Sequence, residues 1–523
     1  MPLDPPDPAA IRAVAQRYGL GLSEADIASF DPFVQGLLAS WDTVEELYTA
    51  SAPAAPERAW HRPEDADNPY GAWYVTTEIT EGGDGPLAGR TVAIKDNTAV
   101  AGVPMMNGSP YLEGYVPRRD ATVVTRLLAA GATIAGKAVC EDLCFSGGSH
   151  TSRPAPVRNP WDERRSAGGS SSGSAALVAG GVVDLATGGD QGGSVRIPSA
   201  YSGTVGHKPT HGLVPYTGAF PIEQTIDHLG PVTRTVADAA LVLSVIAGPD
   251  GLDPRQPRDP TSGTAPEDYV AALARGAEGM RVGVVAEGFG HPNSEAAVDG
   301  AVRAGVDVLR GAGLTAEEVS IPWHAHGARM WDVIATEGAM RQMVEGNGYG
   351  MNWEGRYDPD VMAHYGGRWR ADGSRFSETV KLVLLAGRYA VDREHGRHYA
   401  MARELVPRLR AAYDEALSRY DVLVMPTLPV QSTVLPAADA PREEVIPRAL
   451  EMVTNTCVTD VTGHPACSVP AGLANGLPTG LMIIGKHFDD AAVLRVAHTY
   501  EQAVGGFPAP PARSHAPETP FVG

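Results

Sequence analysis

The sequence predicts an α/β protein with a central mixed β-sheet flanked by helices, preceded by a helical N-terminal region and interrupted by a helical insertion. Strand and helix signals alternate along most of the chain, which is typical of this fold class. Apolar residues recur at helical spacing near the N-terminus, and strand-like runs are scarce between residues 293 and 404. We therefore expect an N-terminal helical region (1–86), a first core segment (87–292), a helical insertion (293–404) and a second core segment (405–523).

Composition limits the classes of protein that this chain can belong to. The 523 residues are 43% hydrophobic and 20% charged, as in globular proteins. The net charge of −20 would repel nucleic acid, and no basic patch offsets it, so we expect no nucleic-acid partner. Four cysteines do not make a disulfide framework, and neither a signal peptide nor a membrane-spanning run is evident. We therefore expect a cytoplasmic protein without membrane contact.

The N-terminal region is predicted to be helical because residues such as Ile11, Val14, Phe33 and Leu37 follow helical spacing. A Pro- and Ala-rich stretch at 51–63 is typical of a linker or a surface segment.

The core is predicted to begin with a strand at 91–94, a helix at 121–131 that ends at a glycine, and a strand at 133–135. Segments 420–426 and 480–485 are further buried strands. The end of the chain is therefore expected to return to the central sheet.

Three patterns resemble known phosphate- or metal-binding motifs but lack residues that those motifs need. Residues 131–138 resemble a phosphate-binding loop, but Ala138 replaces the required Ser or Thr, and a strand runs through the motif. Cys140 and Cys144 have no second ligand pair at zinc spacing. His207 and His211 lack the glutamate of a zinc protease motif. We expect no metal at these positions.

The most informative segments are the Gly- and Ser-rich run at 168–181 and the run at 188–199. A flexible linker would not continue into an apolar, helix-compatible segment such as 175–179, so we expect a buried loop entering a helix. Inward N–H groups of such a loop suit an oxyanion. Ser171 in Gly-x-Ser-x-Gly also matches a nucleophile elbow, but the preceding residues 162–166 are charged and do not resemble the buried strand that motif needs.

These segments, together with Val92-Ala-Ile-Lys-Asp-Asn97 and Gly206-His-Lys-Pro-Thr210, resemble the amidase signature family. The resemblance runs from about residue 87 to residue 501. The N-terminal region and the segments 72–77, 102–109 and 346–352 are similar to the actinobacterial amidases that follow nitrile hydratase in nitrile catabolism. This resemblance implies the amidase signature fold, hydrolysis of linear carboxamides without metal or other cofactor, and a homodimer formed through the helical N-terminus.

The resemblance also implies a Ser-Ser-Lys triad with Ser194 as nucleophile, Ser170 as bridging serine and Lys95 as base. A serine hydroxyl is a weak nucleophile until a neighbouring base takes its proton. A lysine can act as that base where burial lowers its pKa below the usual value of about 10.4. The apolar strand residues before Lys95 favour such burial.

The turn before the nucleophile is expected to hold the oxyanion. Gly192 and Gly193 allow a tight turn in which the N–H groups of Gln191, Gly192, Gly193 and Ser194 converge on that oxygen. By resemblance, Asp190 and Arg196 form an ion pair that braces this turn.

One feature departs from the family pattern. The family reads Gly-Gly-Ser-Ser-Gly-Gly where this chain has Ser172 and Ser174 in place of glycines. Their hydroxyls either perturb the proton relay or bond to backbone, and the sequence leaves both possibilities open.

The leading functional hypothesis is a metal-free amidohydrolase that converts a small-molecule carboxamide with an aliphatic or aromatic acyl group into the carboxylic acid and ammonia. We expect Tyr, Trp and Met side chains of the N-terminal region and of segment 323–352 to shape the acyl pocket. One alternative is the glutaminase subunit of a tRNA amidotransferase, which uses the same triad. The other is a non-catalytic binding protein on the same fold.

Overall fold

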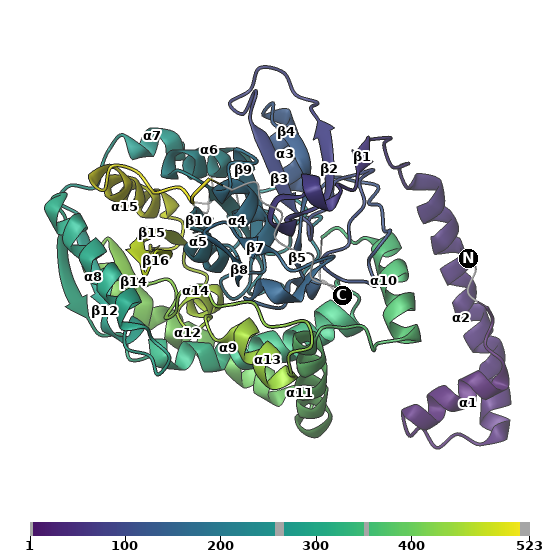
Figure 1. Cartoon of the computed structure of the whole chain (residues 1–523). Coiled ribbons are helices and arrows are strands. Elements are labelled where there is room, and N and C mark those ends of the chain that lie inside the picture. The colour runs from purple at the N-terminus through teal and green to yellow at the C-terminus, as the bar shows by residue number, and fades with distance from the viewer. Residues whose placement is uncertain (1–3, 257–265, 350–354, 513–523) are drawn as a thin grey trace. The chain divides into compact units, whose positions relative to one another are not determined.

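The computed structural model describes residues 4–256, 266–349 and 355–512. The chain divides into two compact units, Met1–Pro56 and Glu57–Gly523 (Figure 1).

The first unit contains the helices α1 (Pro8–Arg17) and α2 (Glu24–Ser51). Asp7 caps α1 by accepting a hydrogen bond from the Ala10 N–H at 2.7 Å. Ser23 and Asp26 form a capping box at the start of α2, which satisfies N–H groups that a helix terminus otherwise leaves free. The predicted helical N-terminus is thus present.

The second unit is built on one mixed sheet of 12 strands. The strands, in spatial order, are β1 (Trp60–His61), β2 (Trp73–Ile79), β4 (Thr133–Ala138), β3 (Thr91–Lys95), β9 (Leu185–Asp190), β11 (His228–Thr233), β10 (Val205–Lys208), β15 (Ala466–Ala474), β16 (Leu477–Ile484), β14 (Val422–Pro426), β12 (Arg281–Val285) and β13 (Thr315–Val319). β3 runs parallel to β4 and β9, whereas β11 is antiparallel to β9 and β10. Two short ribbons, β5 (Cys140–Glu141) with β6 (Ser152–Arg153) and β7 (Arg158–Asn159) with β8 (Asp162–Ser166), lie outside it.

Helices pack on both faces of this sheet (Figure 1). They are α3 (Thr122–Ala129), α4 (Ser172–Ala179), α5 (Arg196–Ser202), α6 (Val236–Ile246), α7 (Tyr269–Leu273), α8 (Ala296–Gly311), α9 (His324–Ala339), α10 (Pro359–Ala371), α11 (Glu378–Glu394), α12 (Arg397–Arg419), α13 (Arg442–Leu450), α14 (Thr456–Thr462) and α15 (Asp490–Ala503).

Strand β14 shows how the sheet separates two hydrophobic cores. Val422 and Val424 belong to the core that contains residues of α3, α6, α8 and α15. Leu423 and Met425 belong to the core that contains residues of α9, α11 and α12. Successive side chains of a strand point to opposite faces, so a continuous apolar run marks a strand that is buried on both sides. This is the α/β architecture that the sequence predicts, and the strands expected at 420–426 and 480–485 both lie in the sheet.

The segment boundaries differ from the expected ones. The division between units falls after Pro56, and β1 and β2 already belong to the main sheet, so residues 57–86 lie with the core. The segment 293–404 is mainly helical, but it contains β13, which pairs with β12 in parallel. It belongs to the same compact unit as the core because this strand extends the core sheet.

The topology brings two strand ends to one place. Since β3 and β9 are parallel neighbours, their carboxyl ends lie at the same edge of the sheet. Lys95 is the last residue of β3 and Asp190 the last of β9, and the chain then forms the turn 191–195 before α5. This edge is where a side chain from β3 can meet a loop from β9.

Candidate active site

Lys95 and Ser170 meet directly in the interior. Both are 0% exposed, and Lys95 Nζ donates a hydrogen bond to Ser170 Oγ at 2.8 Å. A second bond from Lys95 Nζ, to the Gly189 carbonyl at 3.2 Å, holds the side-chain nitrogen against β9. The serine at the start of the α4 segment therefore lies in contact with the lysine at the end of β3.

Ser194 lies in the turn after β9 and is 6% exposed. Its carbonyl accepts a hydrogen bond from the Ser171 N–H at 3.2 Å, which ties the turn to the residue following Ser170. Within the described parts of the chain, no hydrogen bond engages the Ser194 hydroxyl. The structure thus brings the backbone of Ser194 beside the Lys95 and Ser170 pair and leaves its hydroxyl available.

The carbonyl groups of the turn are each held from outside. In a trans peptide the C=O and the next residue's N–H point in opposite directions, so anchoring the carbonyl also aims the N–H. The bonds are His228 Nδ1 with Asp190 O at 3.2 Å, Trp331 Nε1 to Gln191 O at 2.7 Å, Thr456 Oγ1 to Gly192 O at 2.6 Å, and Ile197 N to Gly193 O at 2.6 Å. Four consecutive peptide planes are therefore fixed before any ligand binds.

One of the four predicted oxyanion donors is already in use. The Gly193 N–H donates to Asp190 Oδ1 at 2.6 Å, so the expectation that this N–H faces the oxyanion is wrong for this structure. Its peptide plane is turned toward the carboxylate that braces the loop. The N–H groups of Gln191, Gly192 and Ser194 have no hydrogen-bond partner among the residues that the structure describes.

Asp190 and Arg196 form the buried ion pair that the resemblance implies. Both side chains are fully buried, and the guanidinium contacts both carboxylate oxygens of Asp190 at 2.9 Å. The same carboxylate accepts the Val195 N–H at 3.0 Å. Despite burial, the ion pair and hydrogen bonds with Arg196 lower the pKa of Asp190 to about 2.

A second carboxyl group, Asp460 on α14, shares the guanidinium. Asp460 Oδ2 lies 3.0 Å from Arg196 Nη2, and Thr459 Oγ1 accepts from Arg196 Nη1 at 2.6 Å. Burial and the charge of Asp190 raise the pKa of Asp460 well above its usual range. The guanidinium of Arg196 is therefore shared by two buried carboxyl groups, of which Asp190 has a lowered pKa and Asp460 a raised one.

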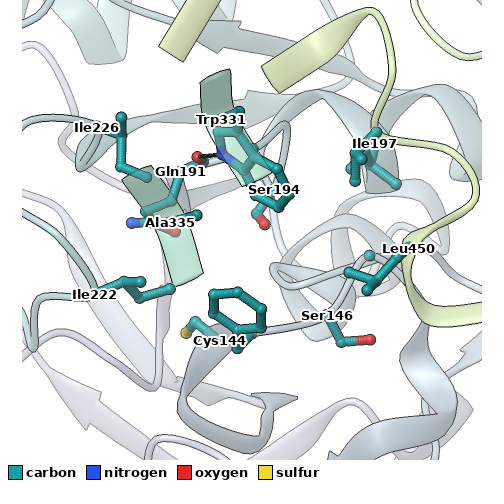
Figure 2. Close-up of a pocket in the computed structure, with 14 residues that line it drawn as sticks. Cys144, Ser146, Gln191, Ser194, Ile197, Ile222, Ile226, Trp331, Ala335 and Leu450 are labelled. Carbon is teal, nitrogen blue, oxygen red and sulfur yellow. Dashed lines mark hydrogen bonds between the residues drawn. The ribbon is translucent and has the colours of Figure 1, made fainter. Parts of the chain in front are cut away.

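Ser194 lies in the lining of a mainly apolar pocket (Figure 2). Its lining includes Cys144, Phe145, Gln191, Gly192, Ile197, Ile222, Ile226, Trp331, Ala335, Leu450 and Val453. Trp331 comes from the segment expected to shape this pocket. Residues 350–352 of the motif at 346–352 lie outside the described residues.

Polar atoms in the pocket are few. Gln191 Nε2 donates to the Tyr216 hydroxyl at 2.9 Å, whereas Gln191 Oε1 is buried without a hydrogen-bond partner in the described structure. An unpaired buried oxygen costs free energy until a donor reaches it. The side-chain carbonyl of Gln191 is thus an acceptor available to a ligand.

The two extra serines bond to neighbouring backbone and side chains rather than to the proposed relay. Ser174 Oγ donates to the Thr187 carbonyl at 2.8 Å. Ser172 Oγ lies 3.4 Å from Ser152 Oγ and 3.5 Å from the Val139 carbonyl. Of the two possibilities left open by the sequence, backbone bonding is the one that the structure supports.

Residues from the rejected motifs have other partners. Lys137 of the apparent phosphate-binding loop forms a buried ion pair with Asp96 at 2.9 Å. His207 lies 3.0 Å from Asp490. Ser171 Oγ bonds to the main chain of Gly189 in β9, and the strand before it, β8, belongs to a separate two-stranded ribbon, so the elbow geometry is absent there.

Several contributors to the site were not found from the sequence, namely Thr456, Asp460, Cys144 and the hydrogen bond of Trp331 to the turn. They lie on α14, α9 and the short helical turn after β5, far from the Gly- and Ser-rich segments along the chain. No local sequence motif identifies these residues, because their role depends only on the carbonyl group or charged side chain that each one contacts in the folded chain.

Known proteins resemble this chain over most of its length. An amidase family model matches residues 35–494, and the chain belongs to the amidase family. An enantioselective amidase from Rhodococcus rhodochrous is 57% identical over 512 residues, covering 97% of this chain and 98% of that protein. The A-type subunit of the glutamyl-tRNA(Gln) amidotransferase from Exiguobacterium sibiricum is 38% identical over 440 residues, covering 83% of this chain and 88% of that protein.

Solved structures agree with this assignment. A peptide amidase from Stenotrophomonas maltophilia superposes with a TM-score of 0.67 at 29% identity, covering 82% of this chain and 86% of that chain. The corresponding amidotransferase subunit from Thermotoga maritima gives a TM-score of 0.69 at 30% identity, covering 85% and 91%. The fold is therefore the amidase signature fold, and the protein is an amidase. Over the described residues, no helix is long and apolar enough to cross a membrane.

Proposed function

We propose that this amidase hydrolyses a small primary carboxamide through an acyl-enzyme on Ser194. The observation that carries the proposal is the buried contact between Lys95 Nζ and Ser170 Oγ beside a turn whose peptide planes are fixed. In acylation, Ser194 Oγ attacks the amide carbon, Ser170 passes the serine proton toward Lys95, and the proton returns to the departing nitrogen as ammonia leaves. Water then attacks the ester carbon by the reverse relay and releases the carboxylic acid.

The oxyanion of each tetrahedral intermediate is assigned to the N–H groups of Gln191, Gly192 and Ser194. Such preorganised donors stabilise charge that develops in the transition state, and removing one typically costs a factor of about 10² to 10³ in kcat. The bonds from Trp331 to the Gln191 carbonyl and from Ile197 to the Gly193 carbonyl keep two of these donors aimed inward.

An aliphatic or aromatic acyl group fits the pocket best. The walls are formed by Ile222, Ile226, Trp331, Leu450 and Phe145, and no charged residue lines them. We assign the unpaired Gln191 Oε1 to the leaving NH₂ group, since a primary amide offers N–H donors there. The relative from Rhodococcus rhodochrous is named an enantioselective amidase, and its 57% identity supports a similar substrate class.

We also infer a cytoplasmic homodimer that acts in nitrile catabolism, after nitrile hydratase has formed the amide. An exposed apolar stripe on α2 supports the dimer: Phe30, Phe33, Leu37, Trp41 and Val44 are each at least 50% exposed and follow a spacing of three and four residues. This spacing is typical of a helix that packs on another helix. Sedimentation of the wild type and of Leu37→Glu tests the dimer.

The test of the catalytic assignment combines covalent labelling with product analysis. Full-length protein is incubated with a small fluorophosphonate and its mass is measured, while ammonia release is followed from propionamide and benzamide. We expect one adduct on Ser194, loss of adduct and of hydrolysis in Ser194→Ala, and strong loss of hydrolysis in Lys95→Ala and Ser170→Ala. Ser174→Ala is the matched control, because its hydroxyl bonds only to backbone, and should keep both signals.

Other outcomes point to the alternatives. An adduct on Ser171 would contradict the assignment of Ser194. Hydrolysis of glutamine only in the presence of added partner subunits would favour the amidotransferase role, and a folded chain with neither adduct nor turnover would favour a binding protein.

A further inference from the structure

A second cluster of polar side chains lies outside the acyl pocket. Asp414 on α12, His464 after α14 and His487 between β16 and α15 each offer one ligand atom, and these atoms all lie within 4.8 Å of one another. His464 Nε2 is 3.0 Å and His487 Nδ1 is 3.9 Å from Asp414 Oδ1. None of the three residues lines the acyl pocket.

Thr462 orients both rings from behind. His487 Nε2 lies 3.0 Å from the Thr462 carbonyl, which can only accept, so this nitrogen carries the hydrogen and the lone pair is left on Nδ1. His464 Nδ1 lies 2.9 Å from Thr462 Oγ1. His464 Nε2 lies 3.0 Å from Asp414 Oδ1, which can only accept, so without an ion this nitrogen carries the hydrogen and Nδ1 accepts from the Thr462 hydroxyl. A bound ion would take the place of the Nε2 hydrogen, and the Thr462 hydroxyl, which can also accept, would then bond to a hydrogen on Nδ1. Histidines that bind metals are oriented in this way by a bond to the second ring nitrogen.

We propose that Asp414, His464 and His487 bind a divalent transition metal ion such as Zn²⁺, with water in the fourth position. Two imidazoles and one carboxylate are a ligand set that suits Zn²⁺, whereas Mg²⁺ and Ca²⁺ prefer oxygen ligands throughout. His464 is fully buried, but the Asp414 side chain is 52% and the His487 side chain 26% exposed, so an ion can enter from solvent.

One basic side chain, Arg410, lies near the cluster. Arg410 Nε donates to the Thr462 carbonyl at 2.9 Å, which places one guanidinium behind that residue. This positive charge opposes a bound cation, and the carboxylate of Asp414, which lies next to both rings, offsets it. We therefore expect Asp414 to be essential for binding, more so than in a site without a neighbouring arginine.

A bound ion would join three separate parts of the chain, which are α12, the end of α14 and the loop before α15. Helix α14 also carries Thr456 and Asp460, which hold the Gly192 carbonyl and Arg196. We assign the ion a stabilising role and no part in the hydrolysis, so this inference does not depend on the proposed reaction.

The test is direct metal binding to the full-length chain after removal of metals with a chelator. Isothermal titration with Zn²⁺, and visible absorption with Co²⁺ in its place, should show one ion per chain. His487→Gln and Asp414→Asn should each weaken binding by at least about 10-fold, since even loss of an outer partner costs that much. His326→Gln, an exposed histidine on α9, is the control and should bind as the wild type does.

Thermal unfolding supplies the second readout. Saturating Zn²⁺ should raise the Tm of the wild type by at least about 2 °C, because an ion that binds only the folded state stabilises it. Neither ligand variant should show this rise. The proposal would be overturned if the wild type did not bind Zn²⁺, or if both ligand variants bound it with the affinity of the wild type.

Discussion

Replacing Asp190 by Asn exchanges one carboxylate oxygen for NH₂ at the side chain that braces the turn 191–195. Asp190 Oδ1 accepts from the Gly193 N–H at 2.6 Å and from Arg196 Nη2 at 2.9 Å. Asp190 Oδ2 accepts from the Val195 N–H at 3.0 Å and from Arg196 Nε at 2.9 Å. Whichever oxygen becomes NH₂, at least two accepted hydrogen bonds turn into contacts between donors.

The magnitude follows from these contacts. Hydrogen bonds to a charged group contribute about 1.5–3 kcal/mol each, and breaking a buried ion pair costs about 3–5 kcal/mol. Asp460 also contacts Arg196, at 3.0 Å, and can offset part of its charge when Asp190 is replaced. We therefore expect the lower end, about 3 kcal/mol of lost stability, and at least a 10-fold fall in kcat because the turn carrying Ser194 loosens.

The assay is urea unfolding of Asp190→Asn together with kcat for amide hydrolysis. Asp184→Asn, just before the other end of β9, is the control. Asp184 Oδ2 accepts hydrogen bonds from both the N–H and the hydroxyl of Thr91, each at 2.9 Å, and an asparagine keeps one oxygen that can accept them. Its cost should stay below about 1 kcal/mol. An Asp190→Asn enzyme with wild-type stability and kcat, or a control that loses as much, would refute the reasoning.

Three further predictions concern the pocket and its surroundings. Burial alone would raise the pKa of the Cys144 thiol, but a hydrogen bond with Cys140 and the nearby Lys95 lower this pKa to about 7. Iodoacetamide should therefore alkylate Cys144, which lines the pocket, faster as the pH rises through that value. A Cys144 that mass spectrometry finds unmodified, or a rate that does not depend on pH, would contradict this. Burial raises the pKa of Glu141 to about 8 from its usual 4.5. The contribution of Glu141 to the free energy of unfolding is therefore complete below pH 4.5 and is lost as the pH rises through about 8. Unfolding curves at pH 5 and pH 9 should show this loss of stability in the wild type and not in Glu141→Gln. Trp331→Phe removes the N–H that donates to the Gln191 carbonyl at 2.7 Å. This change should lower kcat about 10-fold, equivalent to about 1.4 kcal/mol. An unchanged kcat would show that the peptide plane is held without Trp331.

Much of the core could be predicted from the sequence because it depends on local patterns. Continuous apolar runs such as 420–426 predict strands buried on both faces, and the alternation of Val422 and Leu423 between two cores agrees with that. The helical N-terminus followed from apolar spacing in the same way. The boundary near residue 86 did not follow, because pairing of β2 with β4 joins segments that are distant in sequence.

In the candidate site, too, some features could be predicted from the sequence and others could not. Lys95, Ser170, Asp190, Ser194 and Arg196 lie in motifs that can be recognised in the linear sequence, since the tight turn and the strand end need particular residue types at fixed spacing. That Lys95 Nζ meets Ser170 Oγ, and that Ser172 and Ser174 bond elsewhere, required the folded chain.

The sequence by itself therefore determined the fold class, the family resemblance and the residues of the turn 191–195. Only the tertiary structure decided that Gly193 gives its N–H to Asp190, that Trp331 and Thr456 hold the turn, and that Asp414, His464 and His487 come together. The physical reason is that a motif fixes the conformation of neighbouring residues, whereas a hydrogen bond or a metal ligand set depends on the direction of atoms from segments that meet only when the sheet and its helices pack.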